Sequence, residues 1–245
     1  KELVSKLPRN RRKLNISVFK IILVLVLAIV IVGVGAGFGA LKGILDDTPN
    51  INADALIPKG YKTTLVYQNG KEITTLANSN SNREYVYYDS IPEDLVNAFV
   101  AIEDRRFWEH NGIDVQGIAR AFIKGLKSGD FDEGASTLTQ QLIKNNVFNV
   151  GLNESTFLDK LERKVQEQYL AVDMEKKIDK KSIVEYYLNT IYLGEGCYGV
   201  ETAAKTYFGK ELSQLSVSEC AVLAAIPQNP TTVSYTHLTL PTILR

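Results

Sequence analysis

The stretch AIEDRRFWEHNGID, residues 101–114, combines two adjacent acids with two arginines, two aromatic residues and a histidine. Glu103 and Asp104 end an apolar helical pattern, and Phe107 and His110 follow within seven positions. A carboxylate near a helix C-terminus and beside aromatic groups is disfavoured as an anion, so its basicity rises. Such a carboxylate suits a general base. Taken alone, the stretch is equally compatible with a solvated helix end.

A second group of polar residues lies in GASTLTQQLIKN, residues 134–145. Thr137, Gln140 or Gln141, and Lys144 recur at helical spacing, so a hydroxyl, amides and an ammonium share one face. A face so rich in hydrogen-bond donors suits a phosphate or a sugar. The alternative is an ordinary exposed helix face.

A third feature is the pair Arg163 and Glu167, four residues apart in the next predicted helix. In isolation this spacing indicates a surface ion pair worth a few tenths of a kcal/mol. A fourth stretch, residues 180–210, is dense in tyrosine, alanine and glycine. It indicates tight helix packing and is mostly structural.

The elements that must position these residues are mainly helical. Asn69-Gly70 between two β-rich runs predicts a hairpin, and residues 85–88 are a candidate for a further strand. Ser90 to Glu93 is interpreted as a capping box with Pro92 at the first helical position. Helices are predicted over about residues 90–102, 114–126, 136–147, 155–176, 179–193, 200–208 and 216–226, with Asp114, Ser155 or Thr156, Asp179 and Ser216 as N-caps.

The N-terminal part of the chain indicates a membrane anchor. Residues 1–20 carry seven lysines and arginines against one glutamate, and residues 21–41 contain no charged side chain. Roughly 20 apolar residues span a bilayer, whereas a cleaved signal peptide, the alternative, has a shorter apolar core. The preceding basic cluster predicts a cytoplasmic N-terminus and an external body. Because the rest of the chain is acidic, nucleic-acid binding is not expected.

The two cysteines, Cys197 and Cys220, are expected to be unpaired, although an external location would permit a disulfide. The only histidines are His110 and His237, and neither has a cysteine at metal-ligand spacing. A zinc site is therefore not expected.

Together these stretches resemble the five motifs of the family 51 glycosyltransferases, the peptidoglycan polymerases of class A penicillin-binding proteins and their monofunctional relatives. EDRRFWEHNGID is similar to the first motif, GASTLTQQLIKN to the second and RKVQEQYLA to the third. KKSIVEYYLNTIYLG and GVETAAKTYFGK are similar to the fourth and fifth. All five occur in the family's order over about residues 85–230, which makes the set specific.

The resemblance implies a role for each matching residue. Glu103 would be the catalytic base, and Lys144 and Arg163 would bind the donor's pyrophosphate. Glu167 would be a second catalytic carboxylate that orients groups around that pyrophosphate or a metal ion. No cofactor is required, and a divalent cation such as Mg²⁺ stays open. The other implied site residues are Thr137, Gln140, Gln141 and Asn145, which line the cleft, and Asp104, Phe107 and His110, which shape the surroundings of the base.

The fold that the resemblance implies is a lysozyme-like helical lobe with a small hydrophobic jaw beside the membrane. Residues 121–134 match the mobile jaw segment in position. The implied reaction polymerises lipid II into glycan strands with inversion and releases a lipid pyrophosphate. Cations suit this anionic leaving group, whereas a glycosidase needs an acid to protonate its leaving oxygen. The implied partners are lipid II, the growing lipid-linked glycan, the bilayer of the bacterial cell membrane and other cell-wall synthesis proteins.

We therefore expect a basic arm over residues 1–20, an anchor over 21–41, a linker over 42–59 and a glycosyltransferase domain over 60–230. Residues 231–245 are expected to be an atypical tail, either foreign or divergent. Transpeptidase activity is not expected, because the only Ser-x-x-Lys lies at residues 17–20 and Lys-Thr-Gly does not occur. Two rival functions are a lysozyme-like hydrolase, against which Lys144 and Arg163 argue, and an inactive membrane-anchored scaffold, against which Glu103 and Glu167 argue.

Overall fold

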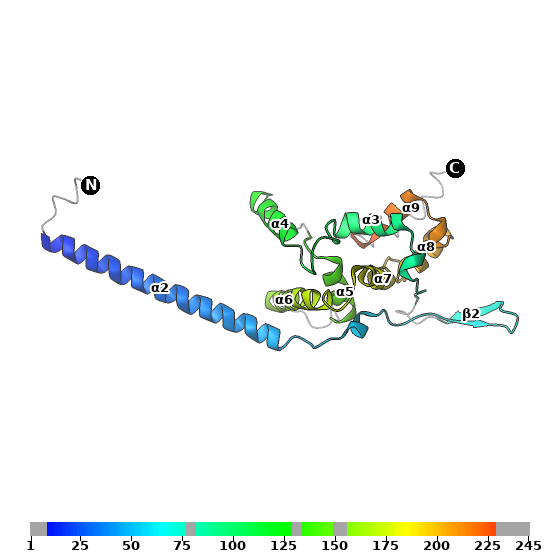
Figure 1. Cartoon of the computed structure of the whole chain (residues 1–245), viewed down its shortest axis with the longest axis horizontal. Coiled ribbons are helices and arrows are strands. Elements are labelled where there is room, and N and C mark those ends of the chain that lie inside the picture. Colours follow the sequence, from blue (N-terminus) through cyan, green and yellow to red (C-terminus); the bar gives the residue numbers. More distant parts are fainter. Residues whose placement is uncertain (1–8, 77–81, 129–133, 149–155, 229–245) are drawn as a thin grey trace. The chain divides into compact units, whose positions relative to one another are not determined.

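The computed structural model describes residues 9–76, 82–128, 134–148 and 156–228 (Figure 1). The chain divides into two compact units, Lys1–Pro49 and Asn50–Arg245. The expected tail over residues 231–245 and residues 129–133 of the expected jaw segment lie outside the described residues.

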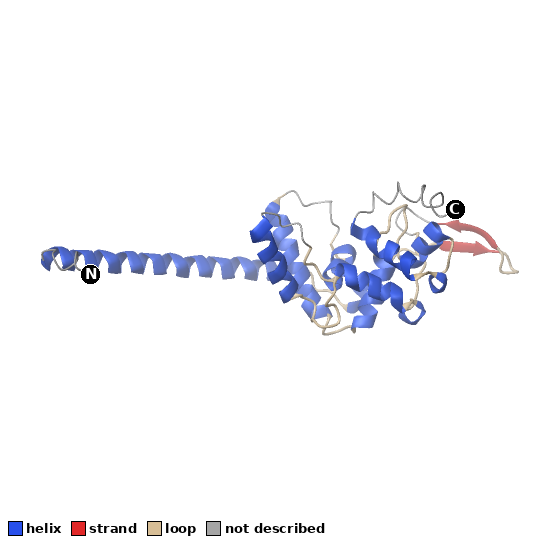
Figure 2. Cartoon of the chain, turned by 90° about the horizontal axis from the view of Figure 1, so that it is seen from above, coloured by secondary structure: helices blue, strands red, loops and turns tan. Residues whose placement is uncertain are grey.

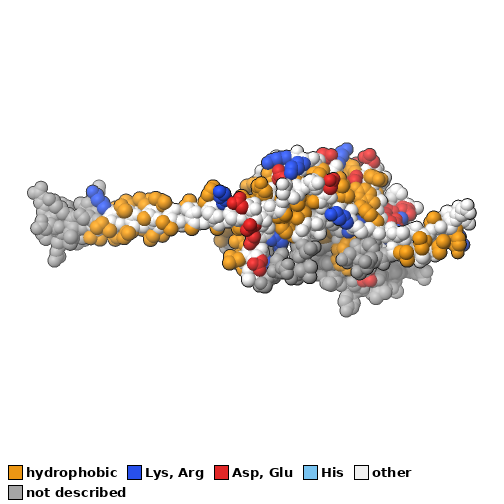
Figure 3. Space-filling view, turned by 90° about the horizontal axis from the view of Figure 1, so that it is seen from below, with side chains coloured by type: hydrophobic (Ala, Val, Ile, Leu, Met, Phe, Trp, Pro, Cys, Tyr) orange, Lys and Arg blue, Asp and Glu red, His pale blue; other side chains and the backbone are white. Residues whose placement is uncertain are grey.

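The first unit is built on one long helix, α2, which spans Arg9–Asp46. Its segment Val18–Asp46 is long and apolar enough to cross a membrane, and none of its most apolar window is buried against other parts of the protein. Apolar side chains cover the face of this helix that Figure 3 shows. The predicted apolar run over residues 21–41 lies inside this segment, so the prediction of a spanning helix is supported by length and composition.

The second unit is a helical body with one small sheet (Figure 2). Its helices are α3 (Glu93–Glu103), α4 (Val115–Ser128), α5 (Leu138–Asn146), α6 (Phe157–Met174), α7 (Lys180–Thr190), α8 (Val200–Phe208) and α9 (Val217–Ala225). Short 3-10 turns occupy Ala53–Leu56, Tyr88–Ser90, Leu212–Gln214 and Ile226–Gln228. The predicted mainly α fold with a small β part is confirmed.

The sheet is the predicted hairpin. Strands β1 (Thr63–Val66) and β2 (Glu72–Leu76) pair antiparallel, with Thr64 opposite Thr75 and an irregularity after Leu65. Gly70 in the connecting turn has a φ of 81°, which glycine adopts without the steric cost of a side chain.

Most of the predicted helix starts are confirmed by hydrogen bonds. The N–H of Gly117 donates to Asp114 at 2.8 Å, and Asp179 accepts from the N–H of Ser182 at 2.9 Å. Thr156 and Ser216 each form a complete capping box. These caps were predictable because both partners lie within one turn of helix.

Three predictions of local structure are wrong. Pro92 is the N-cap of α3 instead of its first residue, because its extended ψ of 137° leaves its carbonyl as the first acceptor of the helix. The N-cap of α5 is Thr137, one residue after the predicted helix start. Helix α7 ends at Thr190, because the carbonyl of Ile191 accepts from Gly199 and leaves the helical ladder.

The candidate strand over residues 85–88 is also wrong. The N–H of Val86 donates to the side chain of Asn189 at 2.8 Å, and the same side chain donates to the carbonyl of Val86 at 2.7 Å. A side-chain amide thus takes the place of a neighbouring strand. The segment is held in an extended form on α7 without joining a sheet.

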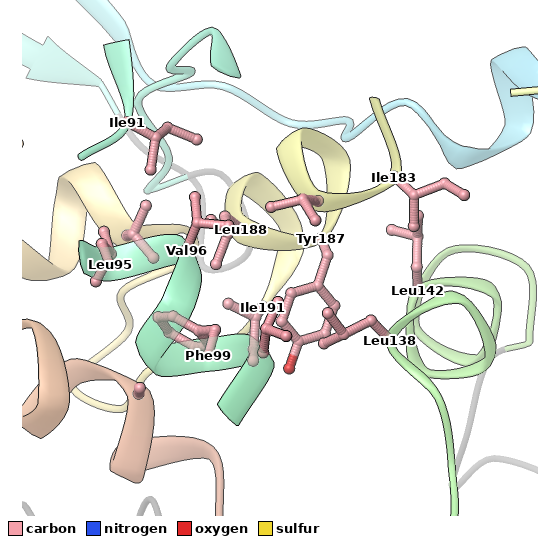
Figure 4. Packing of buried hydrophobic residues seen from close by; sticks show 14 of the residues in the cluster. Ile91, Leu95, Val96, Phe99, Leu138, Leu142, Ile183, Tyr187, Leu188 and Ile191 are labelled. Carbon is pink, nitrogen blue, oxygen red and sulfur yellow. The ribbon is translucent and has the colours of Figure 1, made fainter. Parts of the chain in front are cut away.

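The hydrophobic core lies between α3, α5, α7 and α9. The rings of Phe99 in α3 and Tyr187 in α7 meet edge to face with centroids 6.2 Å apart, and Leu138 and Leu142 of α5 approach from the other side (Figure 4). Cys197 and Cys220 are buried and unpaired, as predicted. These packed helices fix the ends of α3 and α5, where the candidate site residues lie.

Helix α4 does not contribute its apolar face to the hydrophobic core. Its apolar residues have the predicted helical period, but Val115 is 70 % exposed and Leu126 is 64 % exposed. Its buried residues are Gly117 and Gly125. The apolar face of α4 is therefore not part of the core.

Candidate functional site

A cleft of about 920 Å³ lies where α3, α4, α5 and α6 approach one another. The predicted site residues that line it are Glu103, Asp104, Thr137, Gln140, Gln141, Lys144, Asn145, Arg163 and Glu167. Phe107 and His110 are not among its lining residues and pack behind it. The structure thus brings residues separated by more than sixty positions to one cavity.

Glu103 ends α3 and is partly buried at the cleft. Its Oε2 accepts a hydrogen bond of 2.9 Å from Nε2 of Gln141, and the Gln141 oxygen accepts one of 3.2 Å from the hydroxyl of Tyr187. Burial raises the pKa of the Glu103 carboxyl above its ordinary value, the Gln141 hydrogen bond opposes this rise, and the charge of Asp104 adds to it. The side chain combines a fixed orientation with raised basicity.

Asp104 is turned away from solvent and is fixed by three hydrogen bonds. Both of its oxygens lie 2.9 Å from Nε2 of His110, and one accepts from the N–H of Leu138 at 3.0 Å. The side chains of Asp104 and His110 are 2 % and 8 % exposed. The fully buried ring of Phe107 meets the His110 ring nearly at a right angle, with centroids 6.1 Å apart. Asp104 therefore ties the loop after α3 to the start of α5.

Gly112 joins the same loop to α5 and α6. Its carbonyl accepts from Oγ1 of Thr137 at 2.8 Å and from Nε2 of Gln140 at 3.2 Å. A Cβ on Gly112 would lie 2.6 Å from the backbone of Ala171, and its φ is 87°. Because real Cβ atoms do not approach backbone so closely, only glycine fits this contact.

Glu167 is fully buried and lies between two cations. One of its oxygens pairs with Arg163, and the other lies 2.9 Å from Nζ of Lys164, which also donates to Ser136 at 2.7 Å. The i,i+4 pair is confirmed, but it is a buried arrangement instead of the ordinary surface pair that the spacing alone indicates. Pairing of this kind compensates for the hydration that a carboxylate loses on burial.

The other cations of the cleft differ in whether an acidic side chain is paired with them. Arg106 pairs with Asp114, and Asp114 also accepts from Gly117. Burial disfavours ionised Asp114, but these hydrogen bonds and the arginine bring the pKa of its carboxyl below the ordinary value. Lys144, Arg105 and Arg120 also line the cleft, and within the described ranges none of the three has an acidic partner.

The side chains in the described part of the chain do not assemble a metal site. No three His, Cys, Asp or Glu residues there lie together as ligands would. Glu167, the one predicted candidate ligand, has both oxygens occupied by cations. The donor set around it therefore suits an anion-binding wall and does not suit a divalent cation.

This arrangement has a definite chemical capacity. A carboxylate of raised pKa can take a proton from a hydroxyl group within hydrogen-bonding reach. Cations on the same cleft can stabilise an anionic leaving group or a bound phosphate. The cleft is thus suited to a group transfer in which a hydroxyl attacks and an anion departs.

Sequence reasoning missed several residues of the site. Lys164 lies three residues before Glu167, a spacing at which side chains on a helix also meet, so the sequence did contain a signal for this pair. Arg105 stands next to the two acids and was visible in the same stretch. Arg120 and Tyr187 gave no local signal, because their positions depend on how α4 and α7 pack.

Comparison with known proteins gives one family. The family model described as Transglycosylase matches residues 69–241. The chain is 45% identical over 196 residues to penicillin-binding protein 1A of Clostridium novyi (strain NT), covering 78% of this chain and 22% of the relative. It is 52% identical over 148 residues to penicillin-binding protein 1A of Aquifex aeolicus (strain VF5), covering 60% and 19%. Penicillin-binding protein 1F of Bacillus subtilis (strain 168) is 44% identical over 170 residues, covering 69% and 22%. The chain spans about a fifth of the length of these curated relatives.

Proposed function

The chain belongs to the transglycosylase family, and from this premise we propose that it is a peptidoglycan glycosyltransferase that polymerises lipid II into glycan strands. The observation that carries the proposal is Glu103, a partly buried carboxylate of raised pKa in a cleft lined by cations. The family resemblance assigns the same residue as base. Geometry and resemblance therefore support one role.

Glu103 acts on the acceptor in the proposed reaction. It takes the proton from the attacking sugar hydroxyl, whose oxygen forms a bond to the anomeric carbon of the donor. The bond from that carbon to the lipid pyrophosphate breaks, the configuration inverts, and the electron pair leaves with the pyrophosphate. The hydrogen bond of 2.9 Å from Gln141 orients the carboxylate for this step.

The leaving pyrophosphate needs positive charge. Lys144 is the best candidate to supply it, because it lines the cleft, has no acidic partner in the described ranges and is the residue that the family resemblance assigns to this role. Arg163 and Lys164 share the charge of Glu167, so this triad carries a net positive charge. Glu167 then has a positioning role, since it holds two long cationic side chains at the cleft wall. Thr137, Gln140 and Asn145 complete the lining.

The rival hydrolase is disfavoured by the state of the second carboxylate. A glycosidase uses two carboxyl groups, one as the acid and the other as the base or nucleophile. Both carboxylate oxygens of Glu167 are engaged by Arg163 and Lys164. Asp104 is fixed by His110 and Leu138 and is nearly inaccessible to solvent. Neither Glu167 nor Asp104 is therefore free to serve as the second carboxyl group beside Glu103.

We place the enzyme at the bacterial cell membrane, with residues 1–20 in the cytoplasm, an anchor over residues 21–41, a linker over residues 42–59 and the catalytic body over residues 60–230 outside. The apolar segment of α2 and the basic residues that precede it support this placement. The exposed apolar face of α4 supports contact between the body and the bilayer in which its lipid-linked substrates lie. External protease added to spheroplasts should digest the body. Protection of the body would show that it lies in the cytoplasm and would contradict the proposed topology.

The proposed function is tested by incubating the purified full chain with lipid II and, separately, with preformed peptidoglycan glycan. Glycan strands formed from lipid II, with release of lipid pyrophosphate, are the expected result. Cleavage of the preformed glycan by water would identify the hydrolase instead. Absence of both activities in a folded protein would favour the scaffold.

A further inference from the structure

A lysine outside the cleft contacts Phe107, a buried aromatic residue of the loop between α3 and α4, residues 104–114, which is called the catalytic loop below. Lys180, the first residue of α7, has its ammonium nitrogen 4.2 Å from the centre of the Phe107 ring. A cation over an aromatic face is attracted by the ring's quadrupole, and more strongly when water is excluded. The side chain of Lys180 is 22% exposed and Phe107 is fully buried, so this contact is largely shielded. Neither residue lines the cleft.

The ammonium group is held in this place from the other side. It lies 2.7 Å from Oε2 of Glu175, whose side chain is only 3 % exposed. The other oxygen of Glu175 accepts a hydrogen bond from Oγ1 of Thr139. Thr139 of α5, Glu175 at the end of α6 and Lys180 of α7 thus form one chain of contacts. This network fixes the ammonium group relative to all three helices.

Phe107 connects the Lys180 ammonium group to the other residues of the catalytic loop. Its N–H donates to the carbonyl of Asp104 at 2.8 Å, and its ring packs against the ring of His110. His110 in turn holds the carboxylate of Asp104, the residue next to Glu103. A displacement of the Phe107 ring would therefore reach the backbone that carries the catalytic base.

We propose that Lys180 is a positioning residue for the glycosyl transfer, which acts by holding Phe107 and, through His110 and Asp104, the orientation of Glu103. The kinetic part of this inference rests on the proposed function, while the structural part does not. The charge is essential to this role, because an uncharged side chain of equal length would fill the space without attracting the ring. The role also differs from substrate binding, since Lys180 is outside the cleft.

The test uses the full chain with Lys180→Met, Lys180→Arg and the control Lys181→Met. Lys181 is the adjacent lysine and lies 5.3 Å from the ring of a different residue, Tyr88. The chain contains a single tryptophan, Trp108, whose ring centroid is 5.0 Å from that of Phe107. It also contains only two histidines, so NMR signals of the His110 ring are readily assigned. Both reporters respond to the position of Phe107 without requiring any enzymatic activity.

In folded Lys180→Met we expect changed Trp108 emission and shifted His110 ring signals. The kcat for polymerisation should fall about 10-fold to 100-fold, the range caused by misplacing a reacting group by about 1 Å, and KM should stay within about twofold. Lys180→Arg should restore most of the kcat and both signals, and Lys181→Met should match the wild type.

Unchanged Trp108 and His110 signals in folded Lys180→Met would overturn the proposal, as would a loss that Lys180→Arg does not restore. If the reporters shift but the wild type does not polymerise lipid II, the proposed function fails and the link from Lys180 to the loop stands. If Lys180→Met does not fold, Glu175→Gln carries the test, because it removes the anion that holds the ammonium group. That variant should shift both reporters in the same direction, and unchanged reporters there would overturn the proposal.

Discussion

The side-chain amide of Gln141 donates a hydrogen bond of 2.9 Å to the carboxylate of Glu103, across 38 residues of sequence. It is the one direct polar contact to this carboxylate among the hydrogen bonds of the described residues. A base held by one neutral donor stays free to accept a proton at its other lone pairs. This contact therefore orients Glu103 without neutralising it.

Glu103→Gln should abolish most of the activity. The variant keeps the size of the side chain but cannot accept the acceptor's proton, and general-base catalysis contributes about 10²–10⁴-fold. Polymerisation of lipid II should fall by at least this factor, while binding of the lipid-linked donor should survive because Lys144 is intact. Near wild-type polymerisation would move the role of base to another acid, with Asp104→Asn as the next variant to measure.

Gln141→Met should move the acid limb of kcat/KM to higher pH. The ordinary pKa of a glutamate is 4.5, that of Glu103 is raised, and the Gln141 hydrogen bond lowers it. Loss of this donor removes the lowering contribution, so a smaller fraction of Glu103 is ionised at a given acidic pH. Tyr187→Phe, which removes the donor that orients Gln141, should give a smaller shift in the same direction. A limb that stays in place or moves to lower pH contradicts the assignment.

Two glutamates of the cleft should have opposite effects on stability at neutral pH. Because the folded-state pKa of Glu103 is raised, its favourable contribution is present below pH 4.5 and is lost as pH rises through that raised value. Glu103→Gln should therefore raise the melting temperature at pH 7 by a few degrees, the scale of about 1 kcal/mol, and by less at pH 4.

Glu167→Gln should lower the melting temperature at pH 7, because it leaves Arg163 and Lys164 partly buried beside a neutral amide. Breaking a buried pair costs about 3–5 kcal/mol, and the partial exposure of the two cations reduces this figure. Thermal unfolding of both variants gives the comparison, and equal shifts of the same sign would contradict this account.

Lys144→Ala should weaken donor binding and also slow the chemical step. In the proposed reaction the ammonium group stabilises the pyrophosphate in the ground state and in the transition state, so both KM and kcat should change. Lys160→Ala is a matched control, since Lys160 is an exposed lysine of α6 that does not line the cleft. Binding of lipid II to vesicle-reconstituted protein measures the effect. An unchanged affinity in Lys144→Ala would assign the pyrophosphate to other cations, Arg105 and Arg120 being the next to replace.

The apolar face of α4 should enter the bilayer. A polarity-sensitive fluorophore on Leu126→Cys should shift to the blue in vesicles, because that exposed position lies on the apolar face. The control is Lys124→Cys, on the opposite face by helical spacing, which should keep a water-like emission. Cys197 and Cys220 are buried, so labelling should favour the introduced thiol. Identical emission at both positions would exclude insertion of this face.

The sequence predicted the parts of the fold that depend on local contacts. Asp114, Thr156, Asp179 and Ser216 cap their helices within one turn, and Asn69-Gly70 closes its hairpin within two residues. The start of α3 was misassigned, although its signal was also local. Residues 88–90 form a 3-10 turn that ends just before the helix, and this turn competes with the predicted capping box.

The parts that could not be predicted depend on how the helices pack. The helical spacing of its apolar residues predicted one apolar face for α4, but this spacing contains no information on what covers that face. The contact between Gln141 and Glu103 and the one between Lys180 and Phe107 each join distant segments. Most site residues were predicted from their resemblance to a family's motifs. The motifs do not indicate which of the cations are paired with acidic side chains.

The contact at Gly112 also determines where the cleft can change its width. A Cβ there would overlap the backbone of Ala171, and the Gly112 carbonyl is bonded to two side chains at the start of α5. These contacts leave no clearance for the loop after α3 to slide along α5 or α6 at this point. Helix α4 buries only two residues, both glycines, so it is held by less packing than the other helices that line the cleft. We therefore expect any change in the width of the cleft to come from α4, while Glu103 and Glu167 keep a constant separation.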